Sequence, residues 1–216
     1  MTSALKNKSK NWTQNPEAVQ RDILDAATKI FAEQGLSGAR MDDIASATKT
    51  SKRMIYYYFG GKDELYTRVL EAAYSKVRIG EEKLDLAGLP ASKALEKLVG
   101  FTFDHHRKHP DFIRIVMIEN IHHAAFLGQS EVVRDLNLGA IKVLAELLRR
   151  GEASGEFRTG LNPTVLHWQI SAMSFFNVSN MPTFSALFGA DLFTESGQLE
   201  LRDHVVQMIL SHALKT

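Results

Sequence analysis

The sequence contains no cysteine among its 216 residues. Disulfide bonds, thiolate metal ligands and a cysteine nucleophile are therefore excluded, and a reducing compartment suits the chain. Long apolar runs are missing as well, because no stretch approaches the roughly 18 residues that cross a bilayer. Lys6, Lys8 and Lys10 are not followed by an apolar segment, unlike the cations of a secretory signal. We therefore expect a cytoplasmic protein without membrane contact.

Motifs for catalysis are also missing. Residues 60–62 (Gly-Gly-Lys) lack the upstream glycine of a phosphate-binding loop, and no Gly-x-Ser-x-Gly motif occurs. His105 and His109 are four residues apart, and Glu119 lies three and four residues before the pair His122–His123. These spacings place side chains on one helical face, as metal ligands require, but no zinc signature accompanies them. We expect no catalytic residue, no cofactor and no metal.

Alternating strand patterns with hairpin turns are absent, whereas helical spacing of apolar residues runs through the chain. The apolar content of 44% and charged content of 24% are those of a globular protein rather than a disordered one. The fold class is therefore all-α. Beyond a short-helix region, long helices are expected at 62–78, 91–109, 111–127, 131–150, 163–178 and 199–214.

The short-helix region lies near the start of the chain. An apolar stripe from Val19 to Phe31 ends at Gly35, a typical C-cap position. A short helix over 40–48 follows, and Ser51 can cap a second short helix after a tight turn. Two brief helices joined by about three residues are typical of a helix-turn-helix, whose second helix enters the major groove of DNA.

The second short helix has an unusual surface. Ile55 and Phe59 are four residues apart and can anchor it to a core, which leaves cations and tyrosines toward solvent. Cations pair with phosphates, and phenol rings offer hydroxyls and flat apolar surface. The alternative is that the tyrosines pack on the following helix. Charge favours DNA: residues 1–62 hold ten Lys and Arg against six Asp and Glu, so a net charge of +1 divides into +4 there and −3 elsewhere.

The run from about Arg21 to Leu65, about a fifth of the chain, resembles the DNA-binding domain of TetR-type bacterial transcriptional regulators. The matching pieces are Ile30-Phe31-Ala32-Glu33-Gln34-Gly35, Ile44-Ala45, Ser51-Lys52, Tyr56-Tyr57-Tyr58-Phe59, Lys62 and Glu64-Leu65. One departure concerns Arg40-Met41, where the family usually has Thr or Ser, because Met41 cannot donate a hydrogen bond. Arg53 and Met54 also replace small or polar residues, so we expect a base preference particular to this protein.

The resemblance implies two sets of DNA contacts. Phosphates are expected at Arg40, Thr50, Ser51, Tyr56, Tyr58 and Lys62. Base edges are expected near Lys52, Arg53, Met54 and Tyr57. Guanine suits a Lys or Arg side chain, and a thymine methyl suits Met or Tyr.

The helices around 163–180 and 199–214 are apolar on more than one side. Such helices are central in a core or shared with a second subunit, and we favour a four-helix interface between two copies. The resemblance implies the same homodimer. Two copies would place their reading helices in successive major grooves of a palindromic operator.

Many aromatic and methionine side chains occur in the helical body, where they form a plain core or line a cavity. The resemblance implies a cavity for a small-molecule effector that releases DNA. The candidate pocket residues are Phe101, Phe112, Met117, Glu119, Asn120, His123, Trp168, Met173, Phe176 and Asn177.

Three segments are expected: a disordered arm at 1–16, a helix-turn-helix domain at 17–62 and a ligand-binding and dimerisation body at 63–216. The function that fits is a DNA-binding repressor released from a palindromic operator by a small molecule. An activator of the same fold, or a regulator without a ligand, is the alternative. An all-α enzyme and a protein-binding dimer are more remote.

Overall fold

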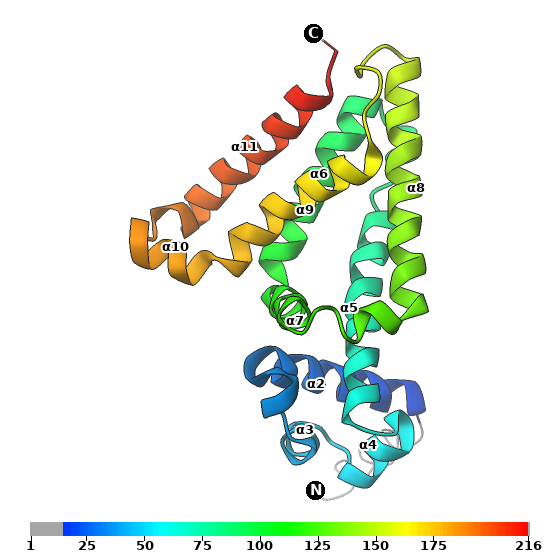
Figure 1. Ribbon diagram of the computed structural model, residues 1–216, viewed down its shortest axis with the longest axis vertical. Helices are drawn as coiled ribbons and strands as arrows, with labels where there is room; N and C mark the ends of the chain where they lie inside the picture. Colours follow the sequence, from blue (N-terminus) through cyan, green and yellow to red (C-terminus); the bar gives the residue numbers. More distant parts are fainter. Residues whose placement is uncertain (1–14, 216) are drawn as a thin grey trace, which may run out of the picture. The chain divides into compact units, whose positions relative to one another are not determined.

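The computed structural model describes residues 15–215 (Figure 1), and within them it contains α-helices, three 3₁₀ helices and no β-strand. The predicted all-α class is confirmed. The arm expected at 1–16 lies outside the described residues up to 14, and Pro16 already begins a helix capped by Asn15. The α-helices are α2 (Pro16–Gly38), α3 (Met41–Ala47), α4 (Lys52–Phe59), α5 (Lys62–Glu82), α6 (Ala91–Lys108), α7 (Pro110–Ile121), α8 (Glu131–Ala153), α9 (Pro163–Ser179), α10 (Met181–Phe188) and α11 (Glu195–Ala213).

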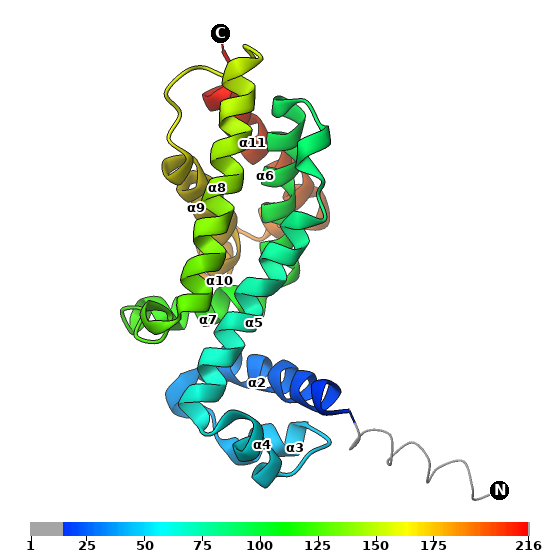
Figure 2. The ribbon, with the colours of Figure 1, turned by 90° about the vertical axis from the view of Figure 1, so that its right-hand side faces the viewer.

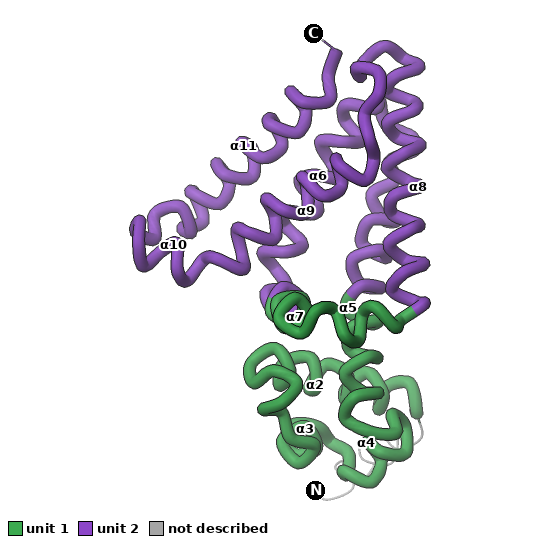
Figure 3. The backbone as a smooth tube through the Cα atoms, viewed as in Figure 1, with its two compact units in different colours: residues 1–73, 114–130 green, residues 74–113, 131–216 purple. Residues whose placement is uncertain are grey.

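The chain forms two compact units, coloured separately in Figure 3. Unit 1 comprises residues 1–73 and 114–130, and unit 2 comprises residues 74–113 and 131–216. Unit 1 therefore takes in the start of α5 and most of α7, because their side chains pack on the short helices. The domain boundary after residue 62 stays a prediction from the sequence. No helix of the described residues is long and apolar enough to span a membrane.

The core of unit 1 joins the short helices to α5. Phe31 of α2 and Tyr66 of α5 meet edge to face, with ring centroids 5.1 Å apart, and Tyr66 meets Phe126 at the same distance. Ile44 of α3 and Ile55 of α4 are fully buried in the same cluster. The three-helix head expected from the sequence is thus held together by a fourth helix and by the segment after α7.

That segment ends α7 earlier than the sequence predicts, at Ile121 rather than near residue 127. His123 and Ala124 have positive φ, which breaks the helix, and a 3₁₀ helix follows at Leu127–Gln129. The buried Glu119 holds the turn, since its Oε2 accepts the backbone N–H of Phe126 at 3.1 Å and of Leu127 at 2.9 Å. A pattern of apolar residues does not predict these side-chain bonds to residues seven and eight positions further along the chain.

Unit 2 is built around α6, which packs against α8, α9 and α11 (Figures 1 and 2). The N-terminus of α6 is capped by Glu156, whose carboxylate accepts Ser92 N at 3.0 Å, Ser92 Oγ at 2.6 Å and Ala91 N at 3.2 Å. The Ser92 bonds, chiefly, hold the pKa of Glu156 down to about 2. Between α9 and α11, the buried amides of Asn177 and Gln198 bond to each other at 2.8 and 3.0 Å.

Helix α10 was not expected from the sequence, which predicts helices only before and after it. Its first turn follows α9 directly at Asn180, and it ends at Gly189, whose φ of 91° suits glycine. A 3₁₀ helix at Asp191–Phe193 then leads into α11. Figure 1 shows α10 at the turn between α9 and α11.

Candidate nucleic-acid interface and effector cavity

Helix α4 is short but firmly anchored in unit 1. Ser51 caps it as predicted, with its Oγ accepting the N–H of Met54 at 3.4 Å. Ile55 and Phe59 bury one face in the core, also as predicted, and Gly60 ends the helix with φ of 82°. The opposite face of α4 is therefore presented to solvent in a fixed orientation.

The turn between α3 and α4 is fixed by side-chain hydrogen bonds. Thr48 Oγ1 donates to the carbonyl of Ala45 at 3.1 Å and accepts the N–H of Thr50 at 3.3 Å. Asp22 of α2 accepts the N–H of Lys49 at 3.1 Å, which ties the turn to the long helix behind it. The turn is thus held by its own threonine and by a carboxylate of α2.

The exposed face of α4 carries the cations and two of the three tyrosines. Tyr57 has 77% of its surface exposed, Tyr56 is also exposed, and Lys52 and Arg53 stand beside them. Tyr58 differs, because it is half-buried against the core and meets the Tyr57 ring edge-on at 5.3 Å. The alternative in which all three tyrosines pack on the next helix does not describe Tyr56 and Tyr57.

Lys52 is paired within the head. Its Nζ lies 2.9 Å from Oδ1 and 3.0 Å from Oδ2 of Asp42, in the first turn of α3. The hydrogen bond to Asp42 raises the pKa of Lys52. Both side chains are largely exposed, so the pair lies on the surface where α3 and α4 meet.

Met41 and two further candidates, Lys62 and Arg40, have distinct surroundings. Met41 is buried in the core of unit 1, so the methionine that replaces a polar family residue serves packing. Lys62 Nζ donates to the carbonyls of Leu36 at 2.9 Å and Ala39 at 3.3 Å, at the end of α2. Arg40 is exposed before α3. Of the ten predicted contact residues, Arg40, Ser51, Lys52, Arg53, Tyr56 and Tyr57 are exposed, and Thr50, Met54, Tyr58 and Lys62 are half-buried.

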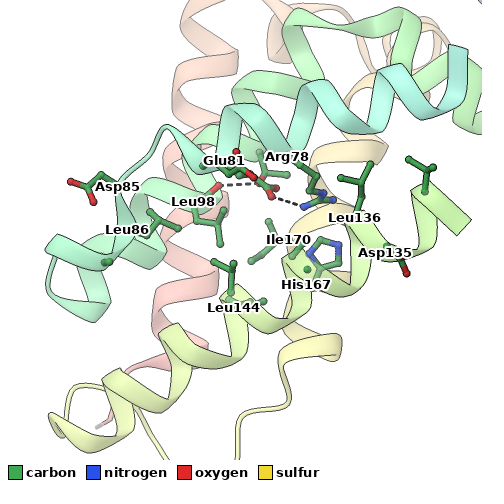
Figure 4. A pocket seen from close by; sticks show the side chains of 17 residues that line it. Arg78, Glu81, Asp85, Leu86, Leu98, Asp135, Leu136, Leu144, His167 and Ile170 are labelled. Atoms are coloured by element: carbon green, nitrogen blue, oxygen red, sulfur yellow. Dashed lines mark hydrogen bonds and ion pairs between the residues drawn. The ribbon is translucent and has the colours of Figure 1, made fainter. Parts of the chain in front are cut away.

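Unit 2 contains a cavity of about 770 Å³ between α5, α6, α8 and α9 (Figure 4). This volume lies within the range of small-molecule sites. Its walls are mainly aliphatic, from Leu86, Leu98, Val132, Leu136, Val143, Leu144 and Ile170. The polar and charged lining residues are Arg78, Glu81, Glu82, Asp85, Thr102, Asp135 and His167.

A half-buried ion pair lines the cavity. Arg78 Nη1 lies 2.5 Å from Glu81 Oε2, and its Nη2 donates to Asn137 Oδ1 at 3.2 Å. Burial raises the pKa of Glu81 against the opposing pull of Arg78. Burial, and then the charge of Arg78, lowers the pKa of His167, so this imidazole is neutral at pH 7.

None of the ten pocket residues expected from the sequence lines this cavity. In unit 2, Trp168 and Phe176 are exposed, Met173 packs on the core and Asn177 is bonded to Gln198. The remaining six lie elsewhere: Phe101 packs over Gly80, Phe112 meets the rings of Tyr74, His105 and His106, and Met117, Glu119, Asn120 and His123 belong to unit 1.

Of the spaced histidines only His105 is buried, in an aromatic cluster with its neighbour His106, whereas the other histidines of the pattern are exposed. His105 and His106 lie near Phe112, and burial is the main cause that lowers the pKa of each to about 4. His106 Nδ1 is 2.8 Å from the Thr102 carbonyl, so it carries the proton of the neutral ring. Among residues 15–215, no group of three or more His, Asp or Glu side chains is arranged to hold a metal ion.

Family models match both the N-terminal and the C-terminal part of the chain. Residues 23–69 match the family model described as bacterial regulatory proteins, tetR family, and residues 92–209 match that of the tetracyclin repressor-like C-terminal domain. The chain is 35% identical over 179 residues to the HTH-type transcriptional repressor NicS of Pseudomonas putida, covering 83% of this chain and 84% of that one. The protein belongs to the TetR family. It is accordingly a DNA-binding transcriptional regulator.

Solved structures of the TetR fold superpose along most of the chain. The fatty acid degradation regulator FadR of Bacillus halodurans has a TM-score of 0.70 at 20% identity, over 91% of this chain and 95% of its own. FadR of Bacillus subtilis in complex with stearoyl-CoA has a TM-score of 0.67 at 18% identity, over 89% and 98%. TetR regulators as a group bind operators, dimerise and bind small-molecule effectors.

Proposed function

We propose that this TetR regulator is a homodimeric repressor that binds a palindromic operator through α4 and releases it when a small molecule occupies the cavity of unit 2. The observation that carries the proposal is the construction of α4. This eight-residue helix is anchored by Ile55 and Phe59, yet its opposite face exposes cations and phenol rings to solvent. Such a face suits a polyanion.

The exposed residues fall into two groups, those that would reach base edges and those that would contact phosphates. Arg53 and Tyr57 lie on the solvent side of α4 and are the best placed to reach base edges, with guanine suited to Arg53. Arg40, Ser51 and Tyr56 border that face and would hold phosphates. Lys62 differs from them, since its ammonium already binds two carbonyls of the head. Its proposed phosphate contact would use the donor that these bonds leave.

Dimerisation would use the exposed apolar residues of α9 and α11. Val165 and Phe176 of α9 are about half exposed and Trp168 is 69% exposed, and Leu199 and Met208 of α11 are exposed as well. Apolar area on this scale is typical of a subunit interface. A second copy would bring a second reading helix to a site about one helical turn of DNA away.

The effector would occupy the aliphatic cavity and contact the Arg78–Glu81 pair. The volume and lining of the cavity suit a largely apolar molecule that also carries a polar group. A structural neighbour of the same fold, FadR of Bacillus subtilis, was solved with stearoyl-CoA, which shows that this architecture accommodates an acyl ligand in that protein.

Selection of bound sequences from a random DNA pool tests the DNA part of the proposal. We expect a palindrome whose half-sites are centred about 10 base pairs apart or a multiple of that distance. Arg53→Ala should then lose discrimination at one base position by about 1–3 kcal/mol. A selected pool without a palindrome, or an Arg53→Ala protein with the wild-type preference at every position, would contradict it.

The effector part is tested with compounds that release a fluorescent operator from the wild-type protein. Gly139 of α8 lines the cavity, and a β-carbon there meets no atom within 4 Å, so Gly139→Phe can place a ring in the empty space. We expect this variant to bind operator but to ignore the compounds. Gly128→Phe is the matched control, because a β-carbon at Gly128 is equally unobstructed but lies in unit 1. An equal response of both variants would rule out this cavity as the effector site.

A further inference from the structure

Helix α10 exposes apolar side chains to solvent along its whole length. It spans only eight residues, Met181–Phe188, and none of them is buried within the chain. Leu187 has 75% of its surface exposed and Phe188 has 72%. Single exposed apolar residues are ordinary, but a whole helix that is apolar and uncovered is not.

The helix is also too short to be stable without packing against other parts of the protein. Isolated helices shorter than about 12–15 residues are marginal in water, and their stability in proteins comes from packing an apolar face. Within its own chain, α10 packs chiefly through Phe184, whose ring centroid lies 6.5 Å from that of Phe176 in α9 and 6.0 Å from that of Phe193. Leu187 and Phe188 lie beyond this contact and pack on little of their own subunit.

The exposed surface of α10 continues that of α9. Phe176 is exposed on α9, Phe184 meets it edge-on, and Phe188 meets Phe184 at 4.8 Å, so three rings form one apolar strip across the two helices. Phe176 belongs to the face through which α9 would meet a second copy. A second copy that covers this face of α9 would therefore also contact the apolar strip.

We propose that α10 is an arm that packs against the second subunit of the dimer and buries Leu187 and Phe188 there. This inference rests on the proposed homodimer and assigns to it a contact outside α9 and α11. The occupant is a second copy of this chain, because the strip is continuous with the face of α9 that such a copy would cover.

The absence of cysteine makes a direct test possible, since one introduced cysteine is the only thiol in the protein. The variant Leu187→Cys is compared with Leu138→Cys, a control on α8 where the native leucine is 53% exposed. Both are treated with a maleimide while sedimentation reports the fraction of dimer. In the dimer, we expect the Leu187→Cys thiol to react at least tenfold more slowly than the control. Dilution to the monomer should remove the difference.

The possible outcomes separate the arm from the dimer. Equal, fast reaction of both thiols in a protein that sediments as a dimer overturns the arm and leaves the dimer intact. A monomer at every concentration overturns both. Slow reaction of the Leu187→Cys thiol in a monomer means that its own chain covers α10, which also overturns the arm. As a second measurement, Phe188→Glu should raise the dissociation constant of the dimer at least tenfold, whereas Leu138→Glu should leave it unchanged.

Discussion

The ion pair between Lys52 and Asp42 leads us to predict that removing the Asp42 charge strengthens the binding of DNA. Lys52 begins the helix proposed to read DNA, yet its ammonium is held at 2.9 and 3.0 Å by both oxygens of Asp42. Lys52 was expected near base edges, and on DNA we expect the carboxylate of Asp42 to keep its ammonium from the nearby backbone and to repel phosphates itself. The change Asp42→Asn removes the charge and keeps the shape, so Lys52 becomes available to the DNA backbone.

The size of the effect follows from counterion release. Each additional phosphate neutralised by a protein steepens the dependence of log K on log salt concentration by about 0.9. Between 50 and 200 mM salt, a fourfold change, the variant should therefore lose about 3- to 4-fold more affinity than the wild type. Since phosphates carry no sequence information, random DNA should gain from the substitution as much as the operator does.

Fluorescence anisotropy with labelled operator and random duplexes, measured across this salt range, gives the slopes. Asp43→Asn is the matched control, because Asp43 is also exposed in the first turn of α3 and loses the same charge, while the bond to Lys52 comes from Asp42. A slope for Asp42→Asn equal to that of Asp43→Asn would mean that pairing with Lys52 has no role. Equal slopes for both variants and the wild type would place this surface away from DNA.

Three predictions concern unit 2. Gly139→Ala in α8 should raise the unfolding midpoint by about 2–4 °C, because alanine has the higher helix propensity. Gly151→Ala should lower the midpoint, because the new β-carbon would lie 2.6 Å from Cγ of the buried Phe157. Calorimetry measures both midpoints. Glu156→Ala should cost about 1–2 kcal/mol in urea unfolding, since it removes the cap of α6. His106, with a pKa of about 4, stays neutral in the folded state while its unfolded counterpart gains a proton below about pH 6.5. The free energy of unfolding should thus fall by about 2 kcal/mol between pH 6.5 and 5 on its account, and His106→Phe should reduce this slope in urea titrations.

The head could be predicted from the sequence because its signals are local. The cap at Ser51 and the spacing of Ile55 and Phe59 each involve residues within one or two helical turns. Gly35 was expected to end the first helix, and its φ of 71° interrupts α2, which otherwise extends to Gly38. The partners of the lysines could not be predicted in this way. Lys52 finds its carboxylate ten residues away, and Lys62 finds carbonyls 23 and 26 residues away, so their pairing depends on how the helices cross.

The cavity could not be located from the sequence for a related reason. Helical periodicity identifies the side of a helix that faces inward, but a cavity forms where inward faces fail to meet, and that depends on several crossing angles at once. Large side chains that were predicted to line the cavity, such as Phe101 and Met173, pack against other residues and do not border an open space. One signal was polar: His167 lies in α9, an otherwise largely apolar helix, and it lines the cavity.

Helix α9 connects the two proposed activities of unit 2. His167 and Ile170 line the cavity, whereas Trp168, between them in sequence, points outward into the surface proposed for the partner. The reciprocal amide bonds of Asn177 and Gln198 tie α9 to α11 in one register, so a displacement of α9 moves both helices of that surface together. Allosteric coupling typically amounts to about 1–3 kcal/mol, which is within reach of a ligand that favours one position of α9 over another. In the proposed dimer, α9 would therefore carry a displacement caused by the effector to the surface between the two copies.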